Sequence, residues 1–346
     1  METHRMKLPE RVVIGTGAIE SLGSELKDVG IKQVSIFTSK TPYSKYRGII
    51  EKTLRSENIT FQWYIVRGEV EEAIEKLERA DIRGDILAFG GGKVIDVGKY
   101  VAWKKKRSFV SIPTTASHDG IASPLVSIPT ENRRYSLFAT VPKLILADIE
   151  IIKTAPYRLS ASGCGDVLAK HTAVRDWRLA HLLRGEYYGE YAASLAEVCV
   201  ERVVNHAELI AGRGAPGIRI LVEALIHCGV IISIAGSSRP CSGSEHLFSH
   251  ALDLIANRPA LHGEQVGVGT IMMAYLHGTD WKMIRDTLRE VGSPTTAEEL
   301  GVKPGAIIKA LTIAHKIRPE RYTILGDRGI SYEAAEKLAK ETGVIP

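Results

Sequence analysis

Strand-like segments that alternate with helix-like segments over the first 150 residues most constrain the fold of this chain. The strand-like segments are β-branched or apolar, and the segments between them carry apolar residues at helical spacing. Such alternation builds a parallel sheet that helices cover on both faces. We therefore predict an α/β fold that opens with a Rossmann-like domain, with strands at residues 11–14, 33–38, 61–66, 85–89 and 108–112 and helices at residues 18–28, 42–56, 69–80 and 93–104.

Two further details belong to this predicted domain. The second helix is expected to start at Pro42, because proline is tolerated at the first helical position, where the missing N–H has no intrahelical partner. Two more short strands are expected at residues 135–140 and 144–147.

After Asp148 the pattern changes, because strand signals nearly vanish and apolar residues recur at helical spacing. We therefore expect an all-α helical domain to follow the Rossmann-like domain. The helical segments are predicted at residues 159–183, 188–209, 218–235, 245–255, 263–275, 281–291 and 304–314. The predicted domain boundary falls between residues 150 and 151.

Composition places the chain among ordinary folded proteins and against nucleic-acid binding. Its 346 residues are 45% hydrophobic, enough for two domains with sizeable cores. The 45 basic and 40 acidic side chains leave a net charge of +5, a small excess for this length. The basic run at residues 104–107 falls where a helix should end, and cations there complement the helix dipole.

The cysteines and the apolar segments indicate a cytoplasmic setting. Cys164, Cys199, Cys228 and Cys241 form no CxxC motif and match no zinc-ribbon spacing, so we expect reduced thiols. The first ten residues lack the apolar core of a signal peptide. No apolar run reaches the roughly 18 residues of a membrane span, so none is expected.

Two glycine clusters compete for the phosphates of a dinucleotide. Gly15 and Gly17 follow the first strand, but Glu20 stands where a Rossmann fingerprint has its third glycine. The stronger cluster is residues 90–92, three glycines between an apolar strand and a helix start. Glycine lets the backbone approach a ligand closely, and the free N–H groups of a helix start bind phosphate. A plain tight turn is the alternative for this cluster.

The end of the second strand bears on the choice of cofactor. A carboxylate there usually binds the ribose of NAD and repels the 2′-phosphate of NADP. Residues 37–40 are Phe-Thr-Ser-Lys and contain no carboxylate. We therefore expect both NAD(H) and NADP(H) to be accepted.

A group of metal-ligating residues lies in the second half. His246 and His250 are four residues apart and share one helix face, His262 precedes another helix, and Asp166 follows a glycine pair. Two imidazoles and a carboxylate with an open fourth position form a common catalytic zinc set. Such a metal can polarise a carbonyl and stabilise the alkoxide that hydride addition creates. A buried packing role is the alternative for any single histidine.

These motifs together resemble a known family. Residues 90–96, GGGKVID, and residues 113–117, PTTAS, are similar to the nucleotide loops of the iron- or zinc-dependent polyol dehydrogenases. Residues 117–124, SHDGIASP, are similar to the archaeal-type sn-glycerol-1-phosphate dehydrogenases within that superfamily, which also holds glycerol dehydrogenase and dehydroquinate synthase. The resemblance covers nearly the whole chain.

The resemblance implies a role for individual residues. Asp166, His246 and His262 would ligate zinc, and Asp119, Asp166 and His250 would bind substrate, with Asp166 and His250 as the catalytic pair. NAD(P) would be bound by Gly92, Lys93, Val94, Ile95, Asp96, Thr114, Thr115, Ala116, Ser117 and Ser123. Residues 1–150 would then be the dinucleotide-binding domain, and residues 151–346 the metal- and substrate-binding domain.

The resemblance also implies a reaction. Dihydroxyacetone phosphate would be reduced with NADH or NADPH to sn-glycerol 1-phosphate, for archaeal membrane phospholipid biosynthesis. Three alternatives stay open: a glycerol dehydrogenase acting on an unphosphorylated polyol, a dehydroquinate synthase without net cofactor turnover, and a non-catalytic nucleotide-binding protein. We further expect a homo-oligomer, since the helical half offers ample surface.

Overall fold

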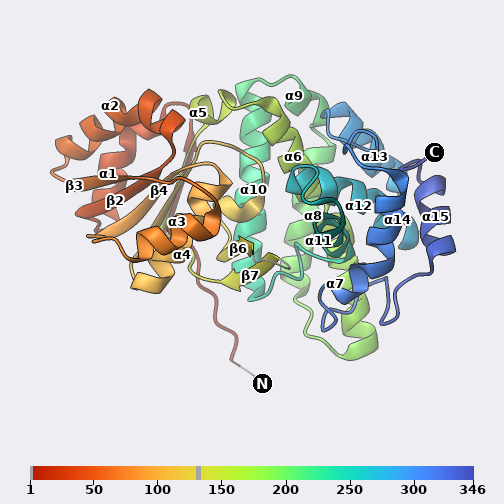
Figure 1. The fold of residues 1–346 in the computed structure, drawn as a ribbon. Coiled ribbons are helices and arrows are strands. Elements are labelled where there is room, and N and C mark those ends of the chain that lie inside the picture. Colours follow the sequence, from red (N-terminus) through yellow and green to blue (C-terminus); the bar gives the residue numbers. More distant parts are fainter. Residues whose placement is uncertain (1–2, 130–133) are drawn as a thin grey trace. The chain divides into compact units, whose positions relative to one another are not determined.

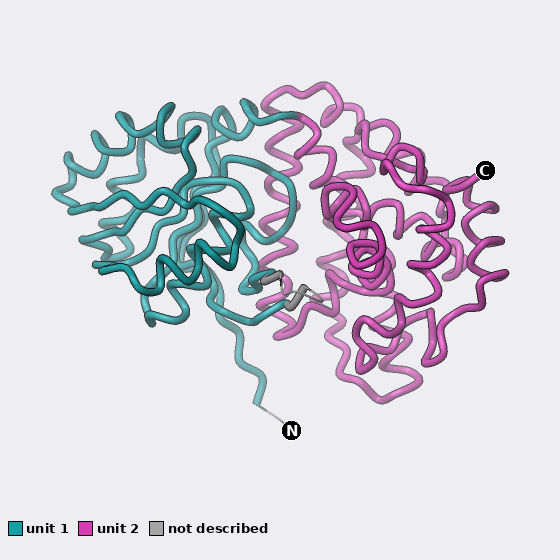
Figure 2. The backbone as a smooth tube through the Cα atoms, in the orientation of Figure 1, with its two compact units in different colours: residues 1–156 teal, residues 157–346 magenta. Residues whose placement is uncertain are grey.

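The chain divides into two units, Met1–Pro156 and Tyr157–Pro346, in a computed structural model that describes residues 3–129 and 134–346 (Figure 2). The division falls six residues beyond the predicted boundary at 150. Helix α5 (Ile149–Lys153) follows strand β8 (Leu144–Asp148) directly and is capped by Asp148, so it stays with unit 1.

Unit 1 contains a six-stranded parallel sheet, as the alternation predicts. Its strand order is β1-β8-β5-β4-β2-β3, and every pair is parallel. Besides β8, the strands are β1 (Arg11–Gly15), β2 (Gln33–Thr38), β3 (Thr60–Ile65), β4 (Asp85–Gly90) and β5 (Phe109–Pro113). The Rossmann-like fold class is therefore confirmed.

A separate antiparallel ribbon is formed by β6 (Leu125–Pro129) and β7 (Arg134–Phe138). The strand predicted at residues 135–140 corresponds to β7, whereas β6 was not predicted. The four residues between the two strands lie outside the described residues.

Helices cover both faces of the sheet (Figure 1). Alternate residues of β4 pack in different hydrophobic clusters, one on each face. On one face, Leu87 packs with Leu26 of α1 (Leu22–Asp28) and Leu54 of α2 (Lys40–Ser56). On the other face, Ile86 packs in the cluster formed with α3 (Val70–Glu78) and α4 (Gly92–Lys105). This two-sided burial explains why β4 is almost entirely apolar.

Two predicted helix starts in unit 1 need correction. Residues 18–21 form a short 3₁₀ helix (Ala18–Ser21) ahead of α1, so the predicted helix at 18–28 has two parts. Pro42 stands at the third position of α2, not the first, because Ser39 is the N-cap. The third position is also tolerated, since its N–H lies among the four without an intrahelical partner.

The strand order creates a switch point between β2 and β4. The connection through α2 carries the chain from β2 outward to β3, and the connection through α4 carries it from β4 the opposite way to β5. In open α/β sheets, ligands bind outside the carboxyl ends of the strands at such a point. Gly90 and Thr38 end the two strands here.

Unit 2 is helical throughout its described residues, as predicted. Its helices are α6 (Tyr157–Leu168), α7 (Lys170–Arg184), α8 (Glu190–Val204), α9 (Ala207–Ala211), α10 (Ala215–Ala235), α11 (Ser244–Ala256), α12 (His262–Leu276), α13 (Trp281–Glu290), α14 (Pro304–Ile313), a 3₁₀ helix (Ala314–Lys316) and α15 (Tyr332–Glu341).

Unit 2 differs from the sequence prediction in two divided segments and one additional helix. The segment 159–183 is divided at Ala169 into α6 and α7, although Ala169 keeps helical backbone angles. The segment 188–209 is divided at His206, whose φ of −129° leaves the helical region. Helix α15 was not predicted, because its buried stripe rests largely on the small residues Ala335 and Ala339.

The expectation that no apolar run reaches the length of a membrane span is compatible with the structure, because Arg219 and Glu223 interrupt the one long apolar helix among the described residues. Helix α10 has the length and composition of a candidate span among the described residues. However, 67% of its apolar stretch is buried inside the protein, as in a core helix.

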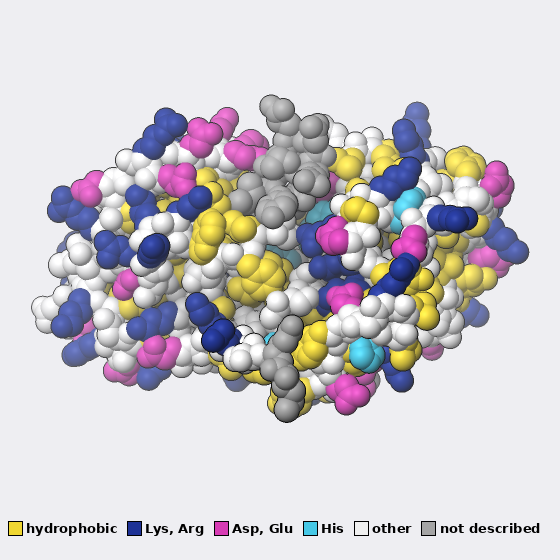
Figure 3. Space-filling model, turned by 90° about the horizontal axis from the view of Figure 1, so that it is seen from below, with side chains coloured by type: hydrophobic (Ala, Val, Ile, Leu, Met, Phe, Trp, Pro, Cys, Tyr) yellow, Lys and Arg dark blue, Asp and Glu magenta, His cyan; other side chains and the backbone are white. Residues whose placement is uncertain are grey.

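On the face of the molecule in Figure 3, basic and acidic side chains are interspersed, in keeping with the small net charge.

Candidate functional site

Close contact between the backbones of α6 and α12 places Asp166 beside His262. A Cβ on Gly165 would lie 2.2 Å from the carbonyl oxygen of Gly263, and one on Gly263 would lie 1.8 Å from the carbonyl oxygen of Ser162. Only glycine fits where two backbones approach this closely. The glycines that precede Asp166 and follow His262 therefore have a packing role.

Asp166, His246 and His262 form a candidate metal centre, which we call the triad. Their ligand atoms all lie within 4.8 Å of one another, and they come from α6, α11 and α12 respectively. The Nε2 atom of His246 lies 3.7 Å from Oδ1 of Asp166, and the His246 and His262 ring centroids are 5.1 Å apart. The sequence-predicted ligands are thus brought together in unit 2.

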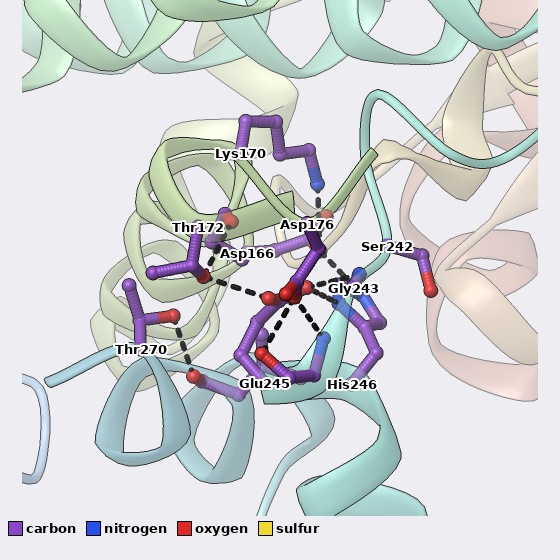
Figure 4. Close-up of polar contacts among 12 residues, drawn as sticks. Asp166, Lys170, Thr172, Asp176, Ser242, Gly243, Glu245, His246 and Thr270 are labelled. Atoms are coloured by element: carbon purple, nitrogen blue, oxygen red, sulfur yellow. Dashed lines mark hydrogen bonds and ion pairs between the residues drawn. The ribbon is translucent and has the colours of Figure 1, made fainter. Parts of the chain in front are cut away.

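A buried carboxylate fixes the orientation of His246. Glu245 lies 2.8 Å from Nδ1 of His246 and also accepts hydrogen bonds from Thr172 and from the Gly243 amide (Figure 4). Because a carboxylate only accepts hydrogen bonds, Nδ1 of His246 carries a proton, and Nε2 is the nitrogen that faces Asp166. This is the usual outer contact of a metal-binding histidine.

A buried lysine neutralises the carboxylate of the triad. Lys170, one turn after Asp166, donates to Oδ1 of Asp166 at 3.0 Å, and both side chains are buried. Burial alone would raise the pKa of Asp166, but Lys170, His246 and His262 outweigh it and hold this pKa well below its ordinary value. Burial would likewise lower the pKa of His246, but its bonds to Asp166 and Glu245 raise it.

His250 lies beside the triad but is not part of it. It is one helical turn after His246 on α11, and its ring centroid is 6.0 Å from that of His262. His250 is therefore near the metal ligands, although it is not in the group whose ligand atoms lie within 4.8 Å of one another. The catalytic and substrate-binding roles expected for His250 and Asp166 remain predictions.

The three glycines in unit 1 form a strand-to-helix turn. Gly90 ends β4, Gly91 is the N-cap and Gly92 is the first residue of α4. The amides of Gly92 and Lys93 have no acceptor earlier in the helix. The Thr114 amide donates to the Gly90 carbonyl at 3.0 Å, which holds the loop after β5 beside this turn.

Some of the predicted nucleotide-binding residues have side chains that face the glycine turn, and others have side chains buried in the core. The side chains of Val94 and Ile95 are buried in the core under α4, and their amides donate to the Gly91 carbonyl. Ala116 is also buried, whereas Thr115 faces Gly91, with its Oγ1 3.5 Å from where a Cβ would lie. Lys93, Asp96, Thr114 and Ser117 lie on the same two segments.

His118 was missed by sequence reasoning and lies over the glycine turn. Its Nδ1 accepts a hydrogen bond from the Gly120 amide at 3.0 Å, so its proton is on Nε2. A Cβ on Gly92 would lie 2.3 Å from that Nε2. The imidazole donor therefore stands next to the free amides that begin α4. His118 could have been predicted from the sequence, because it stands between Ser117 and Asp119, two predicted site residues of the same motif.

The predicted substrate loop is held by a buried lysine. Lys99 of α4 donates to the carbonyls of Gly120 and Leu125 at 2.7 and 2.8 Å. Burial lowers the pKa of Lys99 to about 8, although the charges of Asp96 and Asp119 act to raise it. Asp119 begins the short 3₁₀ helix Asp119–Ile121, and its carbonyl accepts from the amide of the buried Ser123.

The weaker glycine cluster is unsuited to phosphate. Gly17 adopts φ of +71° at the start of the 3₁₀ helix that follows β1. The Ile19 amide at that helix start donates to the buried carboxylate of Asp148 at 3.0 Å. A phosphate placed here would meet that negative charge. The structure therefore favours the turn at residues 90–92.

Comparisons with known proteins agree with this geometry. Residues 13–156 match the iron-containing alcohol dehydrogenase family. A glycerol-1-phosphate dehydrogenase (NAD(P)+) of Pyrococcus horikoshii is 51% identical over 99% of this chain and 100% of its own length. The protein of the same name from Hyperthermus butylicus is 49% identical over 99% of each chain. The chain belongs to the glycerol-1-phosphate dehydrogenase family.

The family resemblance inferred from the motifs is thereby confirmed, and a solved structure supports the fold. Glycerol dehydrogenase from Schizosaccharomyces pombe superposes with a TM-score of 0.82 at 21% identity, covering 99% of this chain and 91% of its own. At that identity the likeness shows the shared fold alone. Membership of the family makes this chain an NAD(P)-dependent oxidoreductase.

Two residues beside the triad were also missed by sequence reasoning. Glu245 directly precedes His246, and Lys170 follows Asp166 at helical spacing. Both patterns are visible in the sequence. Neither is specific, because adjacent charged residues and charge pairs one turn apart are common on exposed helices. Only their complete burial distinguishes them.

Proposed function

We propose that this protein reduces dihydroxyacetone phosphate to sn-glycerol 1-phosphate with NADH or NADPH. The observation that carries the proposal is the identity of about half of all residues with glycerol-1-phosphate dehydrogenases over nearly the full length of both chains. In this proposal unit 1 supplies the nucleotide-binding residues and one substrate contact, Asp119, and unit 2 supplies the metal ligands and the other substrate contacts.

Zinc is the metal proposed for the triad. Two imidazole nitrogens and one carboxylate on three helices match the ligands of catalytic zinc, which keeps a fourth position open. When bound, zinc would polarise the substrate carbonyl and stabilise the negative charge that develops on its oxygen. Glu245 accepts from Nδ1 of His246 and so leaves Nε2 to face the metal, while Lys170 donates to Asp166 and keeps this carboxylate ionised.

His250 is proposed to help deliver the proton that completes the reduction. It lies one helical turn from His246, and hydride addition to a ketone leaves an oxygen that must be protonated. Asp166 would contact the substrate as well as the metal. Asp119 would bind a substrate hydroxyl, since a carboxylate accepts hydrogen bonds but repels a phosphate.

The cofactor phosphates are proposed to bind the glycine turn. The amides of Gly92 and Lys93 and the Nε2–H of His118 are donors that converge on one region. Thr114, Thr115, Ser117 and Ser123 would complete the contacts, whereas Val94, Ile95 and Ala116 would act through their backbone or by packing. Asp96 retains its predicted role in this set.

One assay separates this function from its alternatives. NADH oxidation is measured with dihydroxyacetone phosphate and with dihydroxyacetone, and the product is identified on a chiral column. We expect sn-glycerol 1-phosphate and a strong preference for the phosphorylated ketone. A preference for dihydroxyacetone would indicate a glycerol dehydrogenase. Absence of net NADH oxidation with either ketone would contradict the proposed reaction.

The proposal extends to the cellular setting. The four cysteines are free and buried, in keeping with the expected cytoplasmic location, and the family resemblance implies a role in archaeal phospholipid synthesis. We also propose a homo-oligomer, for which the exposed side chains of Leu182, Leu183 and Tyr191 offer contact surface. Light scattering of the purified protein measures the number of copies.

A further inference from the structure

Three arginines of unit 2, which we call the arginine cluster, gather next to the segment that leads into α11. Arg239 precedes this segment, and Arg318 and Arg321 follow α14. The positive charges of Arg239 and Arg318 both act on Arg321. Neither the zinc triad nor the nucleotide-binding residues account for such a concentration of positive charge.

Arg239 is buried and incompletely satisfied. Only 3% of its surface is exposed, and its Nε and one terminal nitrogen form a two-pronged pair with Glu186 at 2.8 Å. The same terminal nitrogen also donates to the Tyr322 carbonyl. The other terminal nitrogen is buried and has no acceptor among the described residues. A buried donor without an acceptor is costly, so a missing acceptor is expected there.

Arg321 is half-buried and adjoins the same loop. It donates to the Ser242 carbonyl and, at 2.7 Å, to the Ser238 hydroxyl. Burial, together with the charges of Arg318 and Arg239, lowers the pKa of Arg321 to about 9. No carboxylate among the described residues forms an ion pair with Arg321. The partial exposure of this side chain leaves a route for a ligand from solvent.

Arg239 and Arg321 carry more charge than their directly paired carboxylate. These two guanidinium groups have one such carboxylate between them, Glu186, while Glu245 is engaged by His246, Thr172 and the Gly243 amide. An added anion would relieve the repulsion between the arginines. Guanidinium groups suit phosphate in particular, because their planar N–H groups can donate in pairs to its oxygens.

The cluster is connected to the triad by residues 242–246. Arg321 donates to the Ser242 carbonyl. The Gly243 amide donates to Glu245, which directly precedes His246 (Figure 4). Glu245 is also close enough for its charge to act on Arg321. A small substrate whose carbonyl lies at the triad could therefore place a second group near the arginines.

We propose that Arg239 and Arg321 bind the phosphate group of the substrate. The inference rests on the proposed function, and it names the side chains that distinguish a phosphorylated ketone from its unphosphorylated analogue. Arg239 contributes its unpaired terminal nitrogen, and Arg321 contributes the partly exposed guanidinium beside it. Arg318 adds positive charge to the same region.

The test compares two ketones in four proteins. Arg239→Gln, Arg321→Gln and the control Arg219→Gln, an exposed residue paired with Glu223 on α10, are assayed beside the wild type with dihydroxyacetone phosphate and with dihydroxyacetone. Loss of one charge-assisted contact should lower kcat/KM for the phosphorylated ketone roughly 10- to 100-fold. The value for dihydroxyacetone should stay within about threefold of wild type, and Arg219→Gln should change neither.

A structural role for the arginines gives a different pattern. If they only support the loop before His246, both ketones lose activity equally and bound zinc falls, which would overturn the proposal. Arg321→Lys is a second variant that tests the proposal if Arg321→Gln does not fold. Lysine keeps the positive charge but lacks the planar guanidinium group, so we expect this variant to retain part of the preference for the phosphorylated ketone. Its circular dichroism and zinc content should be like those of wild type.

Titration with inorganic phosphate separates this inference from the proposed function. Calorimetry of the wild type should detect phosphate binding that weakens in Arg239→Gln and Arg321→Gln but not in Arg219→Gln. If the wild type binds phosphate in this way yet reduces neither ketone, the reaction is wrong and the anion site stands. If the wild type reduces dihydroxyacetone phosphate and all four proteins bind phosphate equally, the anion site is wrong and the reaction stands.

Discussion

The glycine turn of unit 1 and the triad of unit 2 present their polar atoms in opposite ways. At the turn, the donors are backbone amides of Gly92 and Lys93, placed by a strand, an N-cap and a helix start. At the triad, the polar atoms belong to side chains of Asp166, His246 and His262, and buried charges hold them. One site depends on the course of the backbone, and the other depends on three particular side chains.

This difference predicts how each site responds to substitution. A backbone donor survives a change of side chain as long as the new side chain fits, so residues near the turn should be individually dispensable. A metal ligand cannot be replaced without opening the site, and its buried partners would be left unpaired. Single substitutions should therefore cause much larger losses in unit 2 than in unit 1.

Removal of a triad ligand should have the largest effect. We predict that Asp166→Ala, His246→Ala and His262→Ala each abolish activity and lower bound zinc, because a three-ligand site does not tolerate the loss of one. Zinc per chain is measured by atomic emission, with His206→Ala on the surface as the control. One full equivalent of zinc in all three variants would overturn the ligand assignment.

His250→Ala should separate chemistry from metal binding. It is expected to keep most of the zinc and to lower kcat by roughly 10²–10⁴-fold, the usual contribution of a proton donor. Zinc content and kcat are measured on the same preparation. A loss of zinc equal to that of His246→Ala would make His250 a ligand.

Lys99 tests whether unit 1 also depends on a buried charge. Its pKa of about 8 lies below the ordinary value of 10.5, so between these pH values the unfolded chain binds more protons than the folded chain. The free energy of unfolding should therefore rise with pH over this range, by about 3 kcal/mol from this group. Denaturant unfolding of wild type and Lys99→Met at pH 8 and pH 10.5 measures the difference, and equal pH slopes would contradict it.

Glu245 tests whether the outer contacts of the triad matter as much as the comparison implies. Glu245→Gln keeps the size of the side chain but removes the charge that orients His246. We expect zinc affinity to fall roughly 10- to 100-fold. Competition with a chelator measures this affinity without reference to activity. An unchanged affinity would show that packing alone positions His246.

The smallest effect is expected for the choice of cofactor. Residues 38–40, at the end of β2, contain no carboxylate, so NADH and NADPH should be used within about tenfold, or roughly 1.4 kcal/mol. Ser39→Asp should disfavour NADPH by placing a negative charge there, with Ser39→Asn as the uncharged control. Rejection of NADPH by the wild type of about a thousandfold would contradict this interpretation of the strand end.

The sequence was sufficient for the elements whose pattern is local. The strands of the parallel sheet are short apolar runs bounded by polar turns, so their positions follow from the sequence within a few residues, whereas β6 was not predicted. Helix α15 was not predicted, because a buried stripe made largely of alanine gives no strong periodic signal. The division between α6 and α7 was not predicted, because a local break leaves the helical spacing of apolar residues unchanged. The candidate ligands were found because short motifs surround them.

The environment of those residues was decided by the tertiary structure alone. The sequence determined an α/β unit followed by a helical unit, a glycine turn, and histidines and an aspartate in matching motifs. Only the folded chain brings Asp166 of α6 within reach of His246 and His262, and only it buries Glu245, Lys170 and Arg239. Burial and contact depend on residues far apart in the chain, whereas sequence patterns report only neighbours within one helix or strand.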